Sequence, residues 1–168
     1  MHFSFAHGFD IPLDALELAV LSPELATLVA ANVGNVESIE LVKHAVQDGT
    51  LERVLRYQAN VTVPPFAKNY VTRDMLAWTE DSRYDMKTRT ATWKVTPKIK
   101  PEWQKYFKAS GSYALRADGE SRTTRVIEGD IDLLIPVVGV VAEKLILGEV
   151  KKIYDAEAAA MKSLATLV

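Results

Sequence analysis

The chain has 168 residues, of which 48% are apolar and 25% charged, and its formal net charge is −2 at pH 7. This composition excludes the disordered class, and the charge gives no electrostatic reason to expect nucleic acid as a partner. Because the sequence contains no cysteine, disulfide bonds and thiolate chemistry are excluded as well. We expect residues 1–168 to form one globular domain, since this is an ordinary domain length.

The amino-terminal segment MHFSFAHGFDIP lacks the basic stretch and the long apolar core of a secretory signal peptide. Together with the absence of cysteine, this favours a cytoplasmic location. Phe3, Phe5 and Phe9 alternate with other residues, so residues 1–9 are predicted to form a first strand. Pro12 and Ser22-Pro23 then predict the starts of two short helices, because proline suits the first helical turn.

Six stretches with alternating or β-branched residues follow the two predicted helices. In three of them, 51–63, 107–117 and 122–135, mostly apolar or small side chains recur at every second position, which is typical of a strand with one buried face. Short polar segments between them, QDGT, EDSR and RADGES, are predicted to be hairpin turns. The predicted strands are residues 36–47, 51–63, 69–79, 84–96, 107–117 and 122–135.

The segment IPVVGVVAEKL, residues 135–145, joins the last predicted strand to a long helix. The uncharged run in this region, from Leu133 to Ala142, is only ten residues long, whereas a membrane span needs about 20 apolar residues. We therefore predict that the strand breaks at Pro136 and that a helix runs from there to about Leu164, with one apolar and one charged face.

This order of elements resembles the helix-grip fold of the START/SRPBCC superfamily, which includes lipid-transfer domains, the birch-pollen allergen class and polyketide cyclases. The resemblance covers nearly the whole chain and is closest to a bacterial START-like family of unknown function. It rests on VPPFAKNYV (63–71), on ASGSYALRADGESRTTRVIEGDIDLLIPVVGVVAEKLI (109–146) and on the region of Glu157. One departure is TPKIKPEWQKYF, where a short PGxP-like turn is expected.

The resemblance implies an α+β fold in which a curled antiparallel sheet of about seven strands surrounds the carboxy-terminal helix and leaves a cavity. We expect this cavity to bind a hydrophobic small molecule or lipid non-covalently, without a cofactor or metal. The alternatives are that the same side chains simply fill the core, that a cyclase, dehydratase or hydrolase uses the cavity, or that the domain binds a partner protein. The predicted ligand-binding residues are Tyr57, Ala59, Val61, Tyr113, Ile127, Gly129, Ile131, Glu143, Ile146, Val150, Ile153 and Tyr154.

Two carboxylates of the predicted helix, Glu143 and Glu157, fall on nearly the same side. Facing an apolar cavity, such a group would have a raised pKa and could bind a ligand hydroxyl or act as an acid. The structural alternative is an ion pair with a strand arginine such as Arg53, Arg73 or Arg125. The three histidines lie far apart and no nucleophile motif is present, so a zinc site or a catalytic triad is not expected.

The loop KIKPEWQKYFK, residues 98–108, places aromatic rings among four lysines and one glutamate. Aromatic rings and lysines suit the interface between an anionic membrane and water. Lys98, Lys100, Trp103 and Lys105 are therefore predicted to make transient contact with an anionic membrane. In the alternative interpretation the lysines are solvated surface and the aromatic rings close the end of the sheet.

Overall fold

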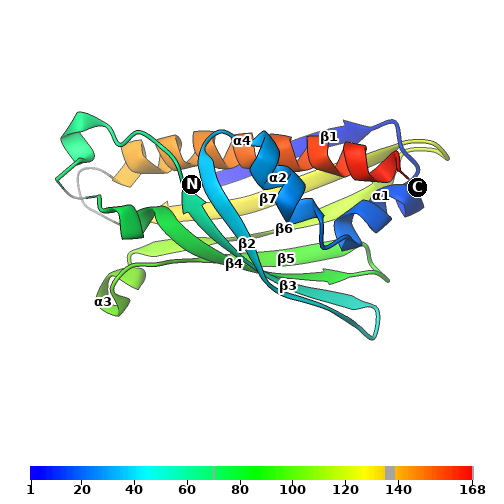
Figure 1. Ribbon diagram of the computed structural model, residues 1–168, viewed down its shortest axis with the longest axis horizontal. Helices are drawn as coiled ribbons and strands as arrows, with labels where there is room; N and C mark the ends of the chain where they lie inside the picture. Colours follow the sequence, from blue (N-terminus) through cyan, green and yellow to red (C-terminus); the bar gives the residue numbers. More distant parts are fainter. Residues whose placement is uncertain (70, 135–138, 168) are drawn as a thin grey trace.

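The computed structural model describes residues 1–69, 71–134 and 139–167, and in it one curled sheet holds a long helix (Figure 1). All neighbouring strands are antiparallel, and their order across the sheet is β1-β7-β6-β5-β4-β3-β2. The strands are β1 (His2–Phe9), β2 (Val36–Gln47), β3 (Thr50–Ala59), β4 (Ala77–Asp85), β5 (Thr90–Pro97), β6 (Phe107–Ala117) and β7 (Thr123–Leu133).

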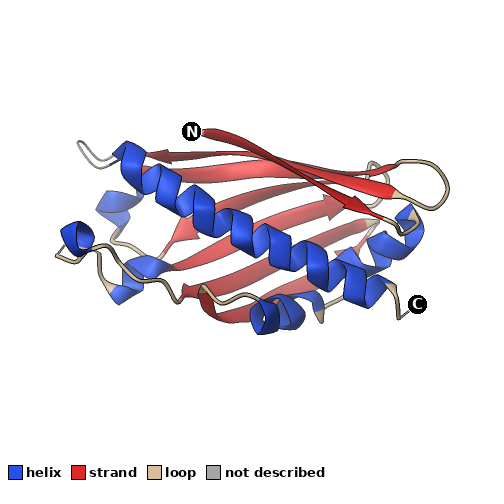
Figure 2. Cartoon of the chain, turned by 90° about the horizontal axis from the view of Figure 1, so that it is seen from above, coloured by secondary structure: helices blue, strands red, loops and turns tan. Residues whose placement is uncertain are grey.

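In the described residues, four α-helices and two 3₁₀ turns accompany the sheet. The long helix α4 lies along the concave face of the sheet, and α1 and α2 lie beside its carboxy-terminal half (Figure 2). This arrangement confirms the predicted α+β helix-grip architecture. The helical elements are α1 (Leu13–Leu21), α2 (Leu25–Asn32), η1 (Pro65–Ala67), η2 (Arg73–Leu76), α3 (Pro101–Gln104) and α4 (Gly139–Ala165).

The predicted hairpins at QDGT and RADGES are confirmed. Asp48 and Gly49 both have positive φ, of 52° and 73°, which is the backbone geometry that a tight two-residue hairpin requires. Gly119 has the same sign of φ, 85°, in the turn between β6 and β7. Both turns lie at the end of the sheet where α1 and the carboxy terminus also lie (Figure 1).

The predicted turn at EDSR is wrong, and so are the predicted strand bounds 69–79 and 84–96. Residues 80–83 lie in the middle of β4, and the turn to β5 falls at residues 86–89. The polar run was misleading because Glu80 and Ser82 point to the concave side of the sheet, where a strand normally carries apolar residues. Residues 60–69 and 71–76 belong instead to the link between β3 and β4, which contains η1 and η2.

The start of α4 is tied to the end of β7. Gly139 lies so close to the Leu133 carbonyl that a Cβ atom there would be 2.5 Å from its oxygen, so only glycine fits without a shift. The Glu143 carboxylate accepts a hydrogen bond from the Leu133 amide at 3.0 Å. The predicted strand break at Pro136 lies outside the described residues, and the described part of the helix runs without interruption through Gly148.

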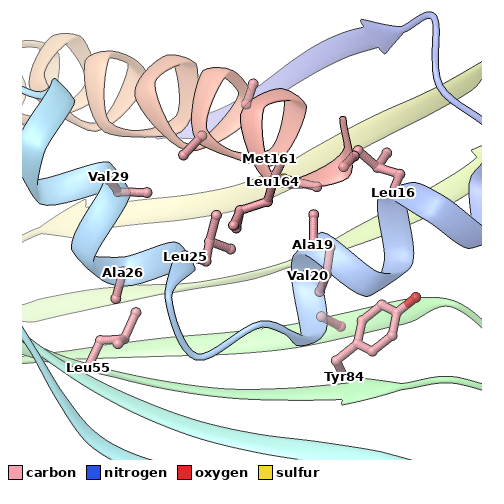
Figure 3. Packing of buried hydrophobic residues seen from close by; sticks show 14 of the residues in the cluster. Leu16, Ala19, Val20, Leu25, Ala26, Val29, Leu55, Tyr84, Met161 and Leu164 are labelled. Atoms are coloured by element: carbon pink, nitrogen blue, oxygen red, sulfur yellow. The ribbon is translucent and has the colours of Figure 1, made fainter. Parts of the chain in front are cut away.

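The main core lies between α1, α2, the second half of α4 and one side of the sheet (Figure 3). Leu16, Leu25 and Met161 are almost completely buried there. Ala158, Ala160 and Ala165 supply small side chains on α4, which allows the short helices to approach closely. A second buried cluster, which we call the Trp93 cluster, contains Phe3, Trp93, Ala109, Ile127 and Ile131, with Ile146, Leu147, Val150 and Tyr154 of α4 packed against it.

Candidate functional site

A small cavity lies between the sheet, α2 and the middle of α4. Its volume is about 40 Å³, which is room for a few water molecules and far below the several hundred Å³ of a typical ligand pocket. Its lining combines aliphatic, aromatic and ionisable side chains. The lining residues are Leu25, Ala26, Val29, Ile39, Arg53, Leu55, Tyr57, Glu80, Ser82, Trp93, Tyr113, Ile153, Tyr154 and Glu157.

Strand alternation places the polar side chains of this cavity. Arg53 and Tyr57 share the inward face of β3, since they are separated by an even number of residues, and both are buried. Glu80 and Ser82 share the inward face of the neighbouring strand β4. The Arg53 guanidinium donates hydrogen bonds to the carbonyls of Val20 and Ser22, which fixes it against the end of α1.

Arg125 of β7 holds α4 over the cavity. Its side chain is 1% exposed, and its guanidinium lies 3.1 Å from the Glu157 carboxylate. The same guanidinium donates to the Tyr154 carbonyl at 3.2 Å. The predicted pairing of Glu157 with a strand arginine is thus confirmed. Glu143 pairs instead with the amino terminus, at 3.9 Å.

Burial controls the ionisation of the groups around the cavity. The pKa of Glu80 is raised to about 7, mainly by burial and next by the Glu157 charge, while Arg53 opposes the rise. Burial also raises the pKa values of Tyr57, Tyr113 and Tyr154, with nearby carboxylates as the next cause. Near neutral pH the three tyrosines are therefore phenols that can donate hydrogen bonds, and Glu80 exchanges a proton readily.

Trp93 connects the cavity to the Trp93 cluster. Its indole lies over the facing glycines of β6 and β7, since a Cβ atom at Gly111 or Gly129 would come within 2.6 Å of the indole. The Trp93 Nε1 atom is buried and has no hydrogen-bond partner among the described residues. A buried donor of this kind costs free energy unless water or a ligand accepts from it.

The predicted ligand-binding residues fall into three groups. Tyr57, Tyr113, Ile153 and Tyr154 line the cavity. Ile127, Ile131, Ile146 and Val150 belong to the Trp93 cluster, where Gly129 contacts the Trp93 and Phe3 rings. Ala59 and Val61 are half-buried at and beyond the end of β3, and Glu143 lies at the junction of β7 and α4.

Sequence reasoning missed Glu80, Ser82 and Trp93, and it considered Arg53 only as a partner for glutamate. The signal for Glu80 and Ser82 was present in the alternation of β4 but was hidden by the misplaced turn. The signal for Trp93 was the pair of glycines on neighbouring strands, Gly111 and Gly129, because two missing side chains leave room for one large ring.

A second depression, of about 390 Å³, lies mainly over the outer side of β3, β4 and β5. It is larger than the cavity but open to solvent, and exposed charged side chains, among them Lys43, Arg83 and Lys94, line much of it. An open, charged surface of this kind does not bury a ligand. The smaller and less open cavity under α4 is therefore the candidate site.

The predicted membrane-contact residues are exposed and lie in the link between β5 and β6. Lys100 precedes the one-turn helix α3, and Lys105 follows it. The Trp103 side chain, in α3, is 49% exposed. No helix in residues 1–69, 71–134 and 139–167 is long and apolar enough to cross a membrane.

Solved structures share this fold across almost the entire chain. TTHA0849 from Thermus thermophilus superposes with a TM-score of 0.67 at 15% identity, covering 99% of this chain and 98% of that one. The ZhuI aromatase/cyclase from Streptomyces sp. R1128 gives 0.64 at 16% identity, with 99% and 93% covered. A START superfamily protein from Mycobacterium smegmatis gives 0.60 at 12% identity, with 97% and 98% covered.

These likenesses confirm the helix-grip fold predicted from the resemblance to the START/SRPBCC superfamily, because the fold is shared at identities this low. No curated protein matches the sequence. A family profile described as "Protein of unknown function (DUF2505)" matches residues 4–164. The chain therefore belongs to the DUF2505 family.

Proposed function

We propose that the protein binds a hydrophobic small molecule or lipid non-covalently between the sheet and α4. One observation carries this proposal: the cavity is lined by tyrosine rings and aliphatic side chains together with a few ionisable groups, and the buried Nε1 donor of one lining residue, Trp93, has no partner among the described residues. Ligand sites are typically apolar with a few polar groups that set the orientation.

The expected mechanism is burial of apolar ligand surface, which stabilises the complex by about 25 cal/mol per Å². The phenols of Tyr57, Tyr113 and Tyr154 and the carboxyl of Glu80 would select a ligand with at least one hydrogen-bonding group. A purely hydrocarbon ligand would leave these buried groups unpaired, which costs about 1–3 kcal/mol for each group.

The cavity must enlarge to hold such a ligand, since about 40 Å³ is too small. Three of its lining residues, Leu25, Ala26 and Val29, come from the eight-residue helix α2. The strand walls are fixed by backbone hydrogen bonds to neighbouring strands, whereas α2 presents apolar side chains that pack along this wall. We infer that α2 is the wall that moves, because packing contacts can be exchanged for contacts with the ligand.

A second candidate is an enzyme of the cyclase, dehydratase or hydrolase type that uses the same cavity. The observation in its favour is the Glu80 carboxyl, whose pKa of about 7 matches the requirement of a general acid or base at neutral pH. One fold neighbour is described as an aromatase/cyclase. In this alternative Glu80 transfers the proton and the tyrosines hold a carbonyl or hydroxyl of the substrate.

Native mass spectrometry of the purified protein, followed by extraction with organic solvent, tests the proposal. We expect a mass above that of the bare chain and an extracted compound that rebinds. Tyr57→Phe and Tyr113→Phe should retain less of this compound than Tyr106→Phe, the matched control at an exposed position outside the cavity. Binding that is equal in all three variants would contradict the proposed site, and chemical conversion of the extracted compound would favour the enzyme.

A further inference from the structure

Exposed apolar side chains gather at one end of the molecule. Eight of the thirteen large apolar side chains that are exposed in the described part of the chain lie there. They come from three segments: the link between β3 and β4, the link between β5 and β6, and the junction of β7 with α4. We call this surface the loop end; its exposed apolar residues are Phe66, Met75, Trp103, Tyr106, Leu134, Val140, Val141 and Leu145.

Contacts between the three segments hold them side by side. The Leu134 amide donates to the Tyr106 carbonyl at 2.7 Å, and the Lys98 amide donates to the Ala77 carbonyl at 2.8 Å. The Lys98 ammonium also lies 3.8 Å from Asp74. Both views show these segments together at the end of the sheet where α4 begins (Figures 1 and 2). The loop end is therefore one continuous region.

Positive charge accompanies these apolar side chains. Residues 98–108 contain four lysines and one glutamate, a net charge of +3, whereas the whole chain has a net charge of −2. The Lys105 ammonium lies 5.0 Å from the centre of the Tyr106 ring, which packs edge-on against Trp103 at 6.4 Å. Lysines and exposed aromatic rings are thus interleaved on the same surface.

We propose that the loop end docks the protein on the headgroup layer of an anionic lipid bilayer. Aromatic rings are favoured at headgroup depth, and lysines are attracted by anionic lipid. A second copy of the chain is a poorer occupant, because a symmetric contact through this surface would bring two +3 segments together. No lining residue of the cavity belongs to the loop end, so docking does not depend on a bound ligand.

Sedimentation with lipid vesicles tests this proposal. We expect the protein to pellet with vesicles of phosphatidylcholine and phosphatidylserine at low salt, and to pellet less with phosphatidylcholine alone or at high salt. Replacing Lys98, Lys100 and Lys105 by serine should weaken binding by more than fivefold and up to about a hundredfold, since each of the three lysines near an anionic surface is worth a factor of about five. The control replaces Lys43, Lys87 and Lys94, exposed lysines outside the loop end, by serine.

The tryptophans supply a second measurement. Of the three, only Trp103 is exposed; Trp78 is half-buried and Trp93 is buried. Anionic vesicles should shift tryptophan emission to shorter wavelength, and Trp103→Phe should abolish this shift. Replacing Phe66 and Trp103 by serine should weaken vesicle binding at every salt concentration. Replacing Leu18 and Leu167 by serine, a control pair that is exposed away from the loop end, should not.

Three results would overturn the proposal. The first is wild-type protein that does not pellet with phosphatidylserine vesicles at low salt. The second is an equal loss of binding in the control lysine variant, which would show only a general attraction. The third is a concentration-dependent dimer in sedimentation velocity that the Trp103 variant abolishes, since the loop end would then be an interface between two copies. Melting temperatures of all variants should stay close to wild type, because the changes are at exposed positions.

Discussion

The two halves of the space beneath α4 are filled in different ways. Under the first half of the helix, the Trp93 cluster packs aromatic and branched side chains against the facing glycines Gly111 and Gly129. Farther along the helix, next to α2 and the main core, Arg53, Glu80 and Glu157 bring ionisable groups into the interior and a cavity remains. Where two glycines leave room for a large aromatic ring, the side chains pack closely. Where polar side chains point inward, close packing is prevented. The same fold thereby contains a closely packed cluster in one part and the candidate site in the other.

Breaking the ion pair at the polar half should have the largest effect. Arg125→Met leaves the Glu157 carboxylate without its partner at 3.1 Å, and removal of one partner of a buried pair costs about 3–5 kcal/mol. We expect the free energy of unfolding, measured by urea denaturation, to fall by about 3 kcal/mol, because Glu157 keeps some access to water.

The double variant Arg125→Met, Glu157→Gln is the control for this prediction. It removes the uncompensated charge as well, so it should recover a large part of the lost stability. A double variant that is less stable than Arg125→Met alone would show that the carboxylate does not depend on Arg125.

The packed half can be tested with a single methyl group. Gly129→Ala places a Cβ atom 2.6 Å from the Trp93 ring and 2.7 Å from the Phe3 ring, and overpacking of this kind costs about 1–3 kcal/mol. Gly8→Ala is the matched control, because a Cβ atom on this β1 glycine meets nothing within 4 Å. Equal unfolding free energies for the two variants would mean that the Trp93 cluster accommodates an added methyl group without strain.

Glu80 should give the polar half a pH-dependent stability. Its pKa is raised from 4.5 to about 7 in the folded protein, so between these values the folded state holds a proton that the unfolded state has released. Stability must then fall as pH rises from about 4.5 to about 7, and remain at the lower level above that.

Glu80→Gln removes this dependence. Between pH 5 and pH 7.5 the free energy of unfolding of the wild type should fall, relative to that of the variant, by on the order of 1–2 kcal/mol. This is less than the free energy that corresponds to the whole pKa shift, because the Glu80 carboxyl opens onto the cavity. Urea denaturation at several pH values measures the difference. Parallel pH profiles would show that Glu80 is not perturbed by its surroundings.

The fold could be predicted to a large extent from the sequence, because its signals are local and repeated. Alternation on the strands, proline at two helix starts and the apolar stripe of α4 led to the observed order of elements. The site could be predicted only in part. Tyr57, Tyr113, Ile153 and Tyr154 were placed by strand parity and helix periodicity, and they line the cavity.

The rest of the site depends on exceptions to those patterns. Glu80 and Ser82 form part of a buried face and yet are polar, so the rule that strands alternate apolar and polar side chains predicted a turn where β4 runs. Whether Ile127 and Ile131 border a cavity or a packed core depends on where the Trp93 ring lies. The position of the ring depends on contacts between strands that are distant in the sequence and helix α4. Such contacts cannot be predicted from a local sequence pattern.

The most direct test of the account is to fill the cavity and measure ligand binding. Ser82 lines the cavity on β4, and Ser110 is exposed on the outer face of β6, so Ser82→Leu and Ser110→Leu make the same chemical change at an inner and an outer position. Titration with cis-parinaric acid, a fluorescent fatty acid, should show that Ser82→Leu weakens binding at least tenfold, about 1.4 kcal/mol, whereas Ser110→Leu binds like wild type. Equal binding by the two folded variants would contradict a ligand site between the sheet and α4.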